Sequence, residues 1–172
     1  VQKMQAEMAP KIEDRRGNIQ RWQELGGLTG RILLAVLLVV IVSHKKLLRI
    51  FLVPGVILLP VTYYYLYQAD YAIFATAIFF CGMVIVAQFS YMSEYLPKAF
   101  PIHLRGTGGS FASNVGGRML GTMAATLNTE FLSTLFTGDN PNKVAMAAAV
   151  IGGSVFALAV VLSFYLPQPR ED

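Results

Sequence analysis

Three stretches of this chain contain no charged residue and are rich in Leu, Ile, Val, Ala and Phe: residues 50–67, 71–92 and 144–166. An α-helix rises about 1.5 Å per residue, so each stretch is long enough to cross a hydrocarbon core about 30 Å thick. Each stretch therefore predicts a transmembrane helix, and the chain as a whole is predicted to be an all-α membrane protein.

The composition agrees with lipid as the solvent. Of the 172 residues, 55% are hydrophobic and 14% are charged, whereas a soluble domain carries about 25% charged residues. The net charge of +4 comes without a basic and aromatic patch, and in membrane proteins an excess of Lys and Arg usually reflects topology. We therefore expect the lipid bilayer to be a partner of the chain and nucleic acid not to be one.

Two further stretches are apolar but contain charges. Residues 25–42 include Arg31, and residues 107–136 are rich in Gly, Ala and Thr and include Arg118 and Glu130. Each stretch has a pair of glycines at the GxxxG spacing that allows close helix approach in lipid. The pairs are Gly26 with Gly30 and Gly117 with Gly121. Together with the three charge-free stretches, these two predict a polytopic bundle of five transmembrane spans within residues 24–172.

Residues 1–23 form the only clearly soluble stretch. Their apolar residues recur at spacings of three, four or seven, which predicts an amphipathic helix with interruptions at Pro10 and at Gly17-Asn18. We expect an external connector on the membrane surface, with a ligand or partner site as the alternative. Because the first residue is Val and no signal peptide is recognisable, the natural start is expected to lie upstream.

The loops between the later spans are short, so consecutive helices are expected to be antiparallel neighbours. Loops 43–49 and 93–106 and the C-terminus hold six Lys and Arg residues, and the loops on the other side hold only Lys143. This bias places the C-terminus in the cytoplasm. The five basic residues of 1–23 fall on the outer side and bring both sides to six. Charge alone therefore leaves the orientation undecided.

Tyrosines crowd around the turn at residues 68–70. An interfacial belt is the simplest interpretation of this pattern. The alternative is a tyrosine-lined binding site, at Tyr63 or Tyr64.

Residues 93–111, SEYLPKAFPIHLRGTGGSF, place charges between two apolar stretches. Pro97 and Pro101 cannot continue a helix, so the third span is expected to end near Tyr95. Glu94 then lies at a helix C-terminus and Arg105 at a helix N-terminus, where the helix dipole disfavours each charge. We expect the two to pair with one another, or with the basic residues of loop 43–49, and to form a cytoplasmic gate. The basic residues are Lys45, Lys46 and Arg49; the alternative is that all these charges are solvated and only set topology.

The longer sequence SEYLPKAFPIHLRGTGGSFASNVGGRMLGT resembles the loop between helices 10 and 11 of the major facilitator superfamily, in particular its bacterial sugar and organic-acid:proton symporters. Residues 25–42, 50–67, 71–92 and 144–166 then match helices 8, 9, 10 and 12. The loop at 43–49 keeps only the basic cluster of the family's helix 8–9 loop and departs from the rest of its pattern.

This resemblance implies a 6+6 helix fold in the inner or plasma membrane with a cytoplasmic C-terminus. It also implies alternating access, proton coupling, and the missing N-terminal half of the same transporter as partner. Two halves rock around a midplane site in such folds, so this half is not expected to transport alone.

Two arginines are the candidates for a substrate pathway. Arg31 lies about 9 Å below the external interface and Arg118 about 17 Å along its helix, at 1.5 Å per residue. A charge at such depth should face the bundle or an aqueous cavity. We expect Arg118, with Asn114 on the same face and Gln88 from helix 10, to contact an anionic or hydroxylated substrate. The alternatives are that Arg31 snorkels to the interface and that Arg118 only cross-links helices through carbonyls or Glu94.

Other functions have less support in the sequence. No paired carboxylates, HExxH, Cys-His cluster or Ser-His-Asp set lies at membrane depth, and both His44 and His103 fall in charged loops. The single cysteine, Cys81, is expected to pack in the core. We therefore predict neither an enzyme nor a cofactor or metal, and the alternative to a transporter is a structural or accessory membrane subunit.

Overall fold

A computed structural model of the protein describes residues 2–41, 43–136 and 140–166, and all regular structure in these ranges is helical. Its long helices are α1 (Gln2–Val40), α2 (His44–Tyr64), α3 (Tyr71–Ala99) and α7 (Asn140–Ser163). Between α3 and α7 lies a helical run of α4 (Arg105–Ala112), η3 (Ser113–Met119), α5 (Leu120–Thr126), η4 (Leu127–Leu132) and α6 (Ser133–Leu135). We call this run, residues 105–135, the mixed helix, because η3 and η4 are π-helical. Two short 3-10 turns, η1 (Leu66–Gln68) and η2 (Ile102–Leu104), complete the order.

Four helices of the described chain are long and apolar enough to cross a membrane: Pro10–Val40, Lys45–Tyr64, Tyr71–Ser93 and Asn142–Ser163. The all-α class is confirmed, and a membrane location is plausible for such a chain. The count of five spans is not confirmed, because residues 107–136 fold as the mixed helix and not as one regular α-helix.

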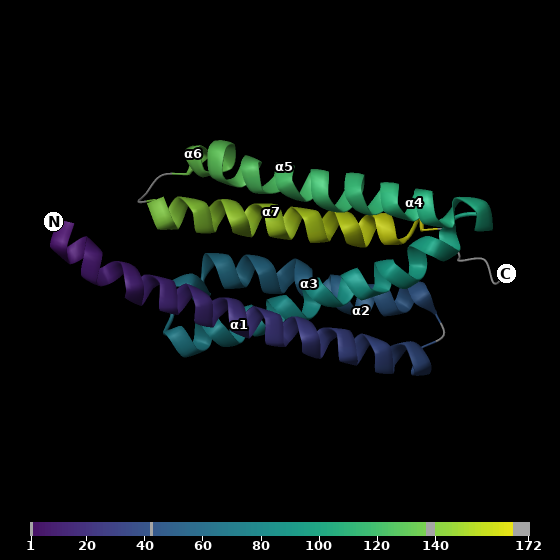
Figure 1. Cartoon of the computed structure of the whole chain (residues 1–172), viewed down its shortest axis with the longest axis horizontal. Coiled ribbons are helices and arrows are strands. Elements are labelled where there is room, and N and C mark those ends of the chain that lie inside the picture. Colours follow the sequence, from purple (N-terminus) through teal and green to yellow (C-terminus); the bar gives the residue numbers. More distant parts are fainter. Residues whose placement is uncertain (1, 42, 137–139, 167–172) are drawn as a thin grey trace.

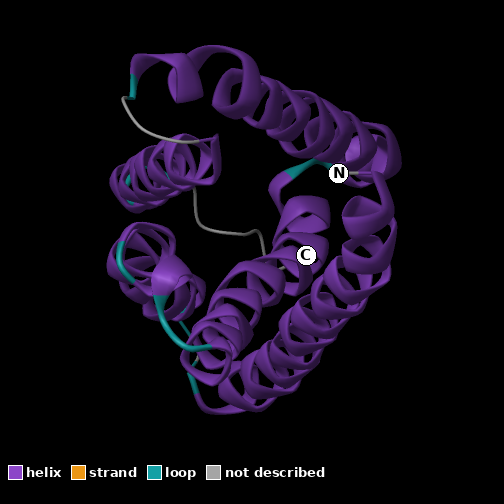
Figure 2. Cartoon of the chain, turned by 90° about the vertical axis from the view of Figure 1, so that its left-hand side faces the viewer, coloured by secondary structure: helices purple, strands orange, loops and turns teal. Residues whose placement is uncertain are grey.

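The helices are arranged as a curved row (Figures 1 and 2). In this row α1 packs on α3, α3 on α2, α2 on α7, and α7 on η4 of the mixed helix. The turn between α2 and α3 and the start of α7 lie at one end of the molecule. The start of α2 and the turn between α3 and α4 lie at the other end (Figure 1). The loops that charge patterning assigned to one side of the membrane are therefore grouped at one end of the fold.

This grouping can be tested by labelling cysteines in intact cells. With the C-terminus in the cytoplasm, a cysteine replacing Asp70 is expected to react with an impermeant thiol reagent from outside, and one replacing Lys98 only after the cells are opened. Cys81 does not interfere because it is buried. Labelling of the Lys98 position from outside would reverse the orientation.

α1 is longer than the sequence pattern predicted, because the helix continues through both expected interruptions. Pro10 removes one backbone hydrogen bond, and at this exposed position water can satisfy the freed carbonyl group. Gly17 weakens a helix by only about 1 kcal/mol relative to Ala. Pairs one turn apart support the exposed part, including Arg16 with Glu13 at 3.2 Å and Gln20 with Glu24 at 3.1 Å.

The expected helix end near Tyr95 is wrong, since α3 runs through Pro97 to Ala99. The chain breaks instead at Phe100, which is extended at φ −107° and ψ 149° and precedes Pro101. A residue before proline is pushed toward extended backbone, whereas a proline in the last turn of a helix leaves few carbonyls unpaired. α4 then begins at Arg105, as predicted.

The loop predicted at 43–49 is also wrong, because α2 begins at His44 and includes the basic cluster. This helical start brings Arg49 to the end of α7. Its Nε donates to Ser163 Oγ at 3.1 Å, its second nitrogen donates to the Ser163 carbonyl at 3.4 Å, and its guanidinium lies 3.9 Å from the centre of the Phe164 ring. A cation at a helix C-terminus is favoured by the helix dipole. Arg49 thus joins α2 to α7.

Replacing Arg49 by Ala is expected to reduce the free energy of unfolding by about 2 kcal/mol, because it removes charged hydrogen bonds and a cation–π contact together. Lys46→Ala removes an exposed charge one turn earlier in α2 and serves as the control. Equal stabilities of the two variants in a reversible denaturation assay would contradict this assignment.

The buried core is built by α1, α2, α3 and α7. It includes Leu34, Phe51, Tyr91 and Phe156, and Cys81 packs within it beside Thr62 at 3.4 Å between sulfur and hydroxyl oxygen. The core position of Cys81 is thus confirmed. Among the described residues of the mixed helix, only Ser133 is buried. The mixed helix therefore lies at the edge of the row and contributes few side chains to the buried core.

Glycines bring α1 and α3 into close contact. A Cβ atom added to Gly26 or Gly30 would overlap the carbonyl groups of Phe79 or Met83, and one added to Gly82 would overlap the carbonyl of Gln23. The first GxxxG pair therefore packs as predicted. The second pair, Gly117 and Gly121, faces open space.

Candidate substrate hollow

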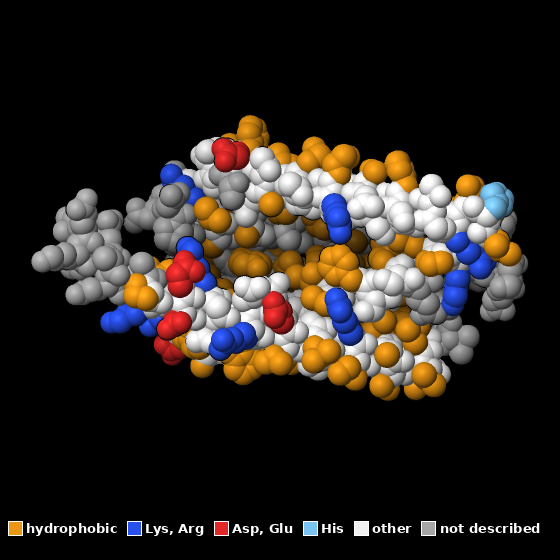
Figure 3. Space-filling view, in the orientation of Figure 1, with side chains coloured by type: hydrophobic (Ala, Val, Ile, Leu, Met, Phe, Trp, Pro, Cys, Tyr) orange, Lys and Arg blue, Asp and Glu red, His pale blue; other side chains and the backbone are white. Residues whose placement is uncertain are grey.

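One face of the molecule is hollowed between the mixed helix and α1. Figure 3 shows hydrophobic side chains on the floor of this hollow. The mixed helix forms one rim and α1 forms the other (Figures 1 and 3).

The side chains of the mixed helix repeat every four residues. In a regular α-helix such a repeat would drift by about 40° at each step. A π-helical turn holds more residues than an α-helical turn, so alternating the two keeps every fourth residue on one face. This period is visible in the residues but was not among the features predicted from the sequence. It gives a polar stripe of Ser110, Asn114, Arg118, Thr122, Thr126 and Glu130 and an apolar stripe of Phe111, Val115, Met119, Met123, Leu127, Phe131 and Leu135.

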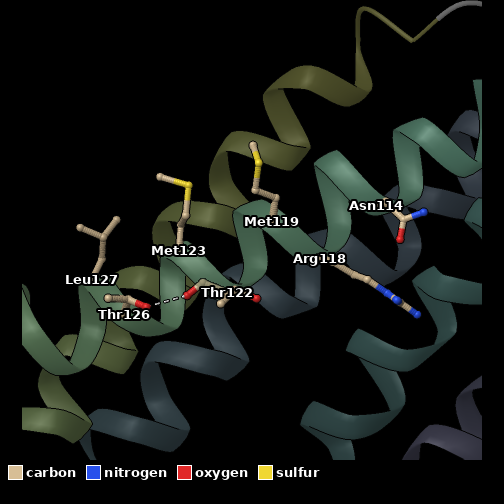
Figure 4. A pocket seen from close by; sticks show the side chains of 7 residues that line it. All are labelled: Asn114, Arg118, Met119, Thr122, Met123, Thr126 and Leu127. Atoms are coloured by element: carbon tan, nitrogen blue, oxygen red, sulfur yellow. Dashed lines mark hydrogen bonds between the residues drawn. The ribbon is translucent and has the colours of Figure 1, made fainter.

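A recess of about 610 Å³ lies along these two stripes (Figure 4). Arg118 and Asn114 line it together with two threonines of the polar stripe. Figure 4 shows Arg118 and Met123 leaving the helix in opposite directions. All of the lining residues come from the mixed helix, so the opposite wall of any site must come from another element.

Arg31 belongs to α1, the helix that forms the opposite rim (Figures 1 and 3). Lys or Arg side chains are visible on both rims midway along the molecule (Figure 3). Within the apolar stretches 25–42 and 107–136, Arg31 and Arg118 are the only basic residues. Both are exposed, and neither forms a hydrogen bond or an ion pair within the ranges that the structure describes. Each of the two helices that form the rims thus has an exposed guanidinium group without a partner in those ranges.

The two predicted amide partners of Arg118 are bonded to their own helices. Asn114 Nδ2 donates to the Ser110 carbonyl at 2.9 Å, and Gln88 Nε2 donates to the Val84 carbonyl at 3.3 Å. Asn114 shares the recess with Arg118, whereas Gln88 is not among the residues that line it. The participation of Gln88 stays a prediction.

The predicted gate residues lie at the end of the molecule where α2 and α4 begin (Figure 1). Lys45 and Lys46 are in the first turns of α2, and Arg105 Nε donates to the Phe100 carbonyl at 3.4 Å. The side chain of Glu94 lies outside the part of the chain that the structure describes, so its pairing with Arg105 stays a prediction. The gate hypothesis did not predict the hydrogen bonds by which Arg49 of α2 joins Ser163 of α7.

Metal chemistry has no candidate in the described ranges, which contain no group of three His, Cys, Asp or Glu side chains placed to hold an ion. Comparisons with protein-family models, with curated proteins and with solved structures find no match for this chain. The case for a function therefore depends on the residues and on their geometry.

Proposed function

We propose that this chain is the larger part of one half of a secondary active transporter, and that it binds a small anionic solute between Arg31 and Arg118. The observation that carries the proposal is that the two helices on either side of one hollow each have an exposed arginine in an apolar stretch, without a partner in the described ranges. The sequence resemblance to symporters of the major facilitator superfamily supports the same function.

Electrostatics favours an anion as the solute. A charged side chain at the bilayer centre costs at least about 2.5 kcal/mol, so each arginine needs an aqueous or ionic partner. Two cations across one cavity also repel each other, and an anion between them removes both penalties. The guanidinium group presents a planar fork that matches a carboxylate. Of the two solute classes that the resemblance implies, sugars and organic acids, this arrangement favours organic acids.

The packing of the two rims suits a cavity that opens and closes. α1 is held to α3 by glycine contacts, whereas the mixed helix buries few side chains. Motion of the mixed helix relative to α1 would change the separation of the two arginines and thus the affinity for an anion between them. Transport through such a cavity needs the partner half, and we propose proton coupling, as in the symporters that the sequence resembles.

A structural or accessory membrane subunit is the second candidate. The open space beside Gly117 and Gly121 favours it, because small residues in lipid provide a surface for a helix of another protein. Such a subunit would have no need of an exposed arginine in each of two apolar stretches.

Uptake into proteoliposomes separates the two candidates. We expect the complete gene product to accumulate a labelled mono- or dicarboxylate when a proton gradient is imposed, and to lose this uptake when Arg31 is replaced by Gln. Labelled glucose should not be accumulated. Absence of uptake for every carboxylate tested, with the protein folded and inserted, would favour the accessory subunit.

A further inference from the structure

A second recess, of about 640 Å³, lies away from the two arginines, at the end of the molecule where α2 ends and α7 begins. Its polar and aromatic lining comes from four elements: Tyr63 of α2, Tyr67 of η1, Phe74 of α3 and Asn128 of η4. Small apolar side chains of α7 complete the lining. None of its described lining residues carries a charge.

One residue that lines the recess has a buried hydrogen-bond acceptor without a donor. Asn128 Oδ1 is inaccessible to solvent and has no hydrogen-bond partner among the described residues. A buried polar atom that is left unpaired is unfavourable. Asn128 lies in the π-helical segment η4, and π-helical insertions are frequent at functional sites. This position therefore calls for a ligand that donates a hydrogen bond.

The tyrosines at this end of the molecule divide into two groups. Tyr64 and Tyr65 are exposed at 49% and 68% and pack edge to face at 4.7 Å, as expected of an interfacial belt. Tyr63 and Tyr67 line the recess instead. The exposed pair fits an interfacial belt, and of the two residues named for a tyrosine-lined site, Tyr63 lines the recess and Tyr64 does not.

The two inner tyrosines differ in their bonding. The Tyr67 hydroxyl donates to Asn142 Oδ1 at 2.7 Å and also contacts Gln68 Nε2, so its ring is held in place. The Tyr63 hydroxyl forms no hydrogen bond within the described residues and is available to a ligand as a donor or as an acceptor.

We propose that this recess binds a neutral polyhydroxyl group. On binding, the Asn128 amide turns into the recess and its Oδ1 accepts a hydrogen bond from one ligand hydroxyl. Another hydroxyl bonds the Tyr63 hydroxyl, and the carbon-bound face of the ligand packs on the rings of Phe74 and Tyr67. An anion is disfavoured because the described lining offers no cation and presents a carbonyl oxygen. The group can belong to a free polyol or to the sugar headgroup of a lipid, since both supply the same donors at this end of a membrane helix.

The test uses the whole chain in nanodiscs of phosphatidylcholine, whose headgroup has no hydroxyl donor. In one arm, sorbitol is titrated and its contact with the protein is followed by saturation-transfer NMR. In the other arm, the nanodiscs contain a monoglucosyl diacylglycerol and bound lipid is counted by native mass spectrometry. We expect saturable binding in at least one arm, and the arm identifies the source of the group.

Asn128→Leu should weaken this binding by about tenfold or more, and Tyr63→Phe by several-fold, because each removes one hydrogen bond. Tyr65→Phe removes the same atom from an exposed ring nearby and should leave binding unchanged. If Asn128→Leu does not fold, Tyr63→Phe compared with Tyr65→Phe decides the question. Excess succinate should not displace the probe, which separates this recess from the arginine-lined hollow. No saturable binding in either arm, or equal affinity in the Tyr63→Phe and Tyr65→Phe variants, would show that the recess holds only water and overturn the proposal.

Discussion

Replacing Gly82 by Ala is expected to destabilise the chain by at least about 2 kcal/mol, although Ala is the better helix former. The added methyl group would overlap the carbonyl of Gln23 in α1. Backbone atoms cannot rotate away as a side chain can, so the two helices must separate and lose their other contacts. Overpacking of well-packed sites costs about 1–3 kcal/mol even where side chains can adjust.

Gly121→Ala is the matched control. This glycine is also helical and in an apolar stretch, but a Cβ atom there meets nothing within 4 Å. Removing a glycine from a helix interior is worth about 0.5–1 kcal/mol, so this variant should be as stable as the parent or slightly more stable. Both variants are compared by reversible unfolding in mixed micelles. Equal stabilities would mean that α1 and α3 do not pack through Gly82.

Replacing Arg118 by Lys is expected to lower the affinity for an anionic solute by about tenfold to a hundredfold, with normal membrane insertion. The substitution keeps the charge but removes the planar fork that bonds a carboxylate through two nitrogens. Hydrogen bonds that involve a charged group contribute about 1.5–3 kcal/mol, which corresponds to this range.

Arg21→Lys is the control for Arg118, since Arg21 is an exposed arginine of α1 that contacts only Asn18 one turn away, at 3.4 Å, in the described part of the chain. Carboxylate binding is measured by isothermal titration of the complete gene product. Unaltered affinity in the Arg118→Lys variant would remove Arg118 from the solute site and leave it a structural role.

The sequence predicted the helices better than their ends. Charge-free stretches identify membrane helices because lipid excludes charges, and residues 50–67, 71–92 and 144–166 lie largely within α2, α3 and α7. The ends were wrong where proline was assumed to stop a helix, at Pro10 and Pro97, because exposed or terminal carbonyls need no partner from the helix. The hydrogen bonds of Arg49 join residues far apart in the chain, and no local pattern predicts them.

The candidate site was predicted in part. Arg31 and Arg118 were predicted from membrane depth alone, because a charged side chain in lipid is costly and is seldom found there without a function. The pairing of Arg118 with Asn114 followed from helix geometry, and the recess contains both. The full polar stripe was not predicted, because its period of four belongs to a helix of alternating α and π turns and not to a regular α-helix.

The central claim is that Arg31 and Arg118 border one water-filled hollow, and thiol labelling of the complete gene product in a membrane tests it most directly. Cysteines are placed one at a time at Arg31, Arg118 and Ile57 in a Cys81→Ser background, and each is treated with a small charged thiol reagent that reacts in water but not in lipid. Ile57 is the comparison, because it is an exposed residue of the charge-free stretch of α2 and is not among the residues that line the recess of Arg118. We predict fast labelling at positions 31 and 118, slowing of both by a bound carboxylate, and slow labelling at position 57. Slow labelling at 31 and 118 together with fast labelling at 57 would place the arginines in lipid and contradict the account.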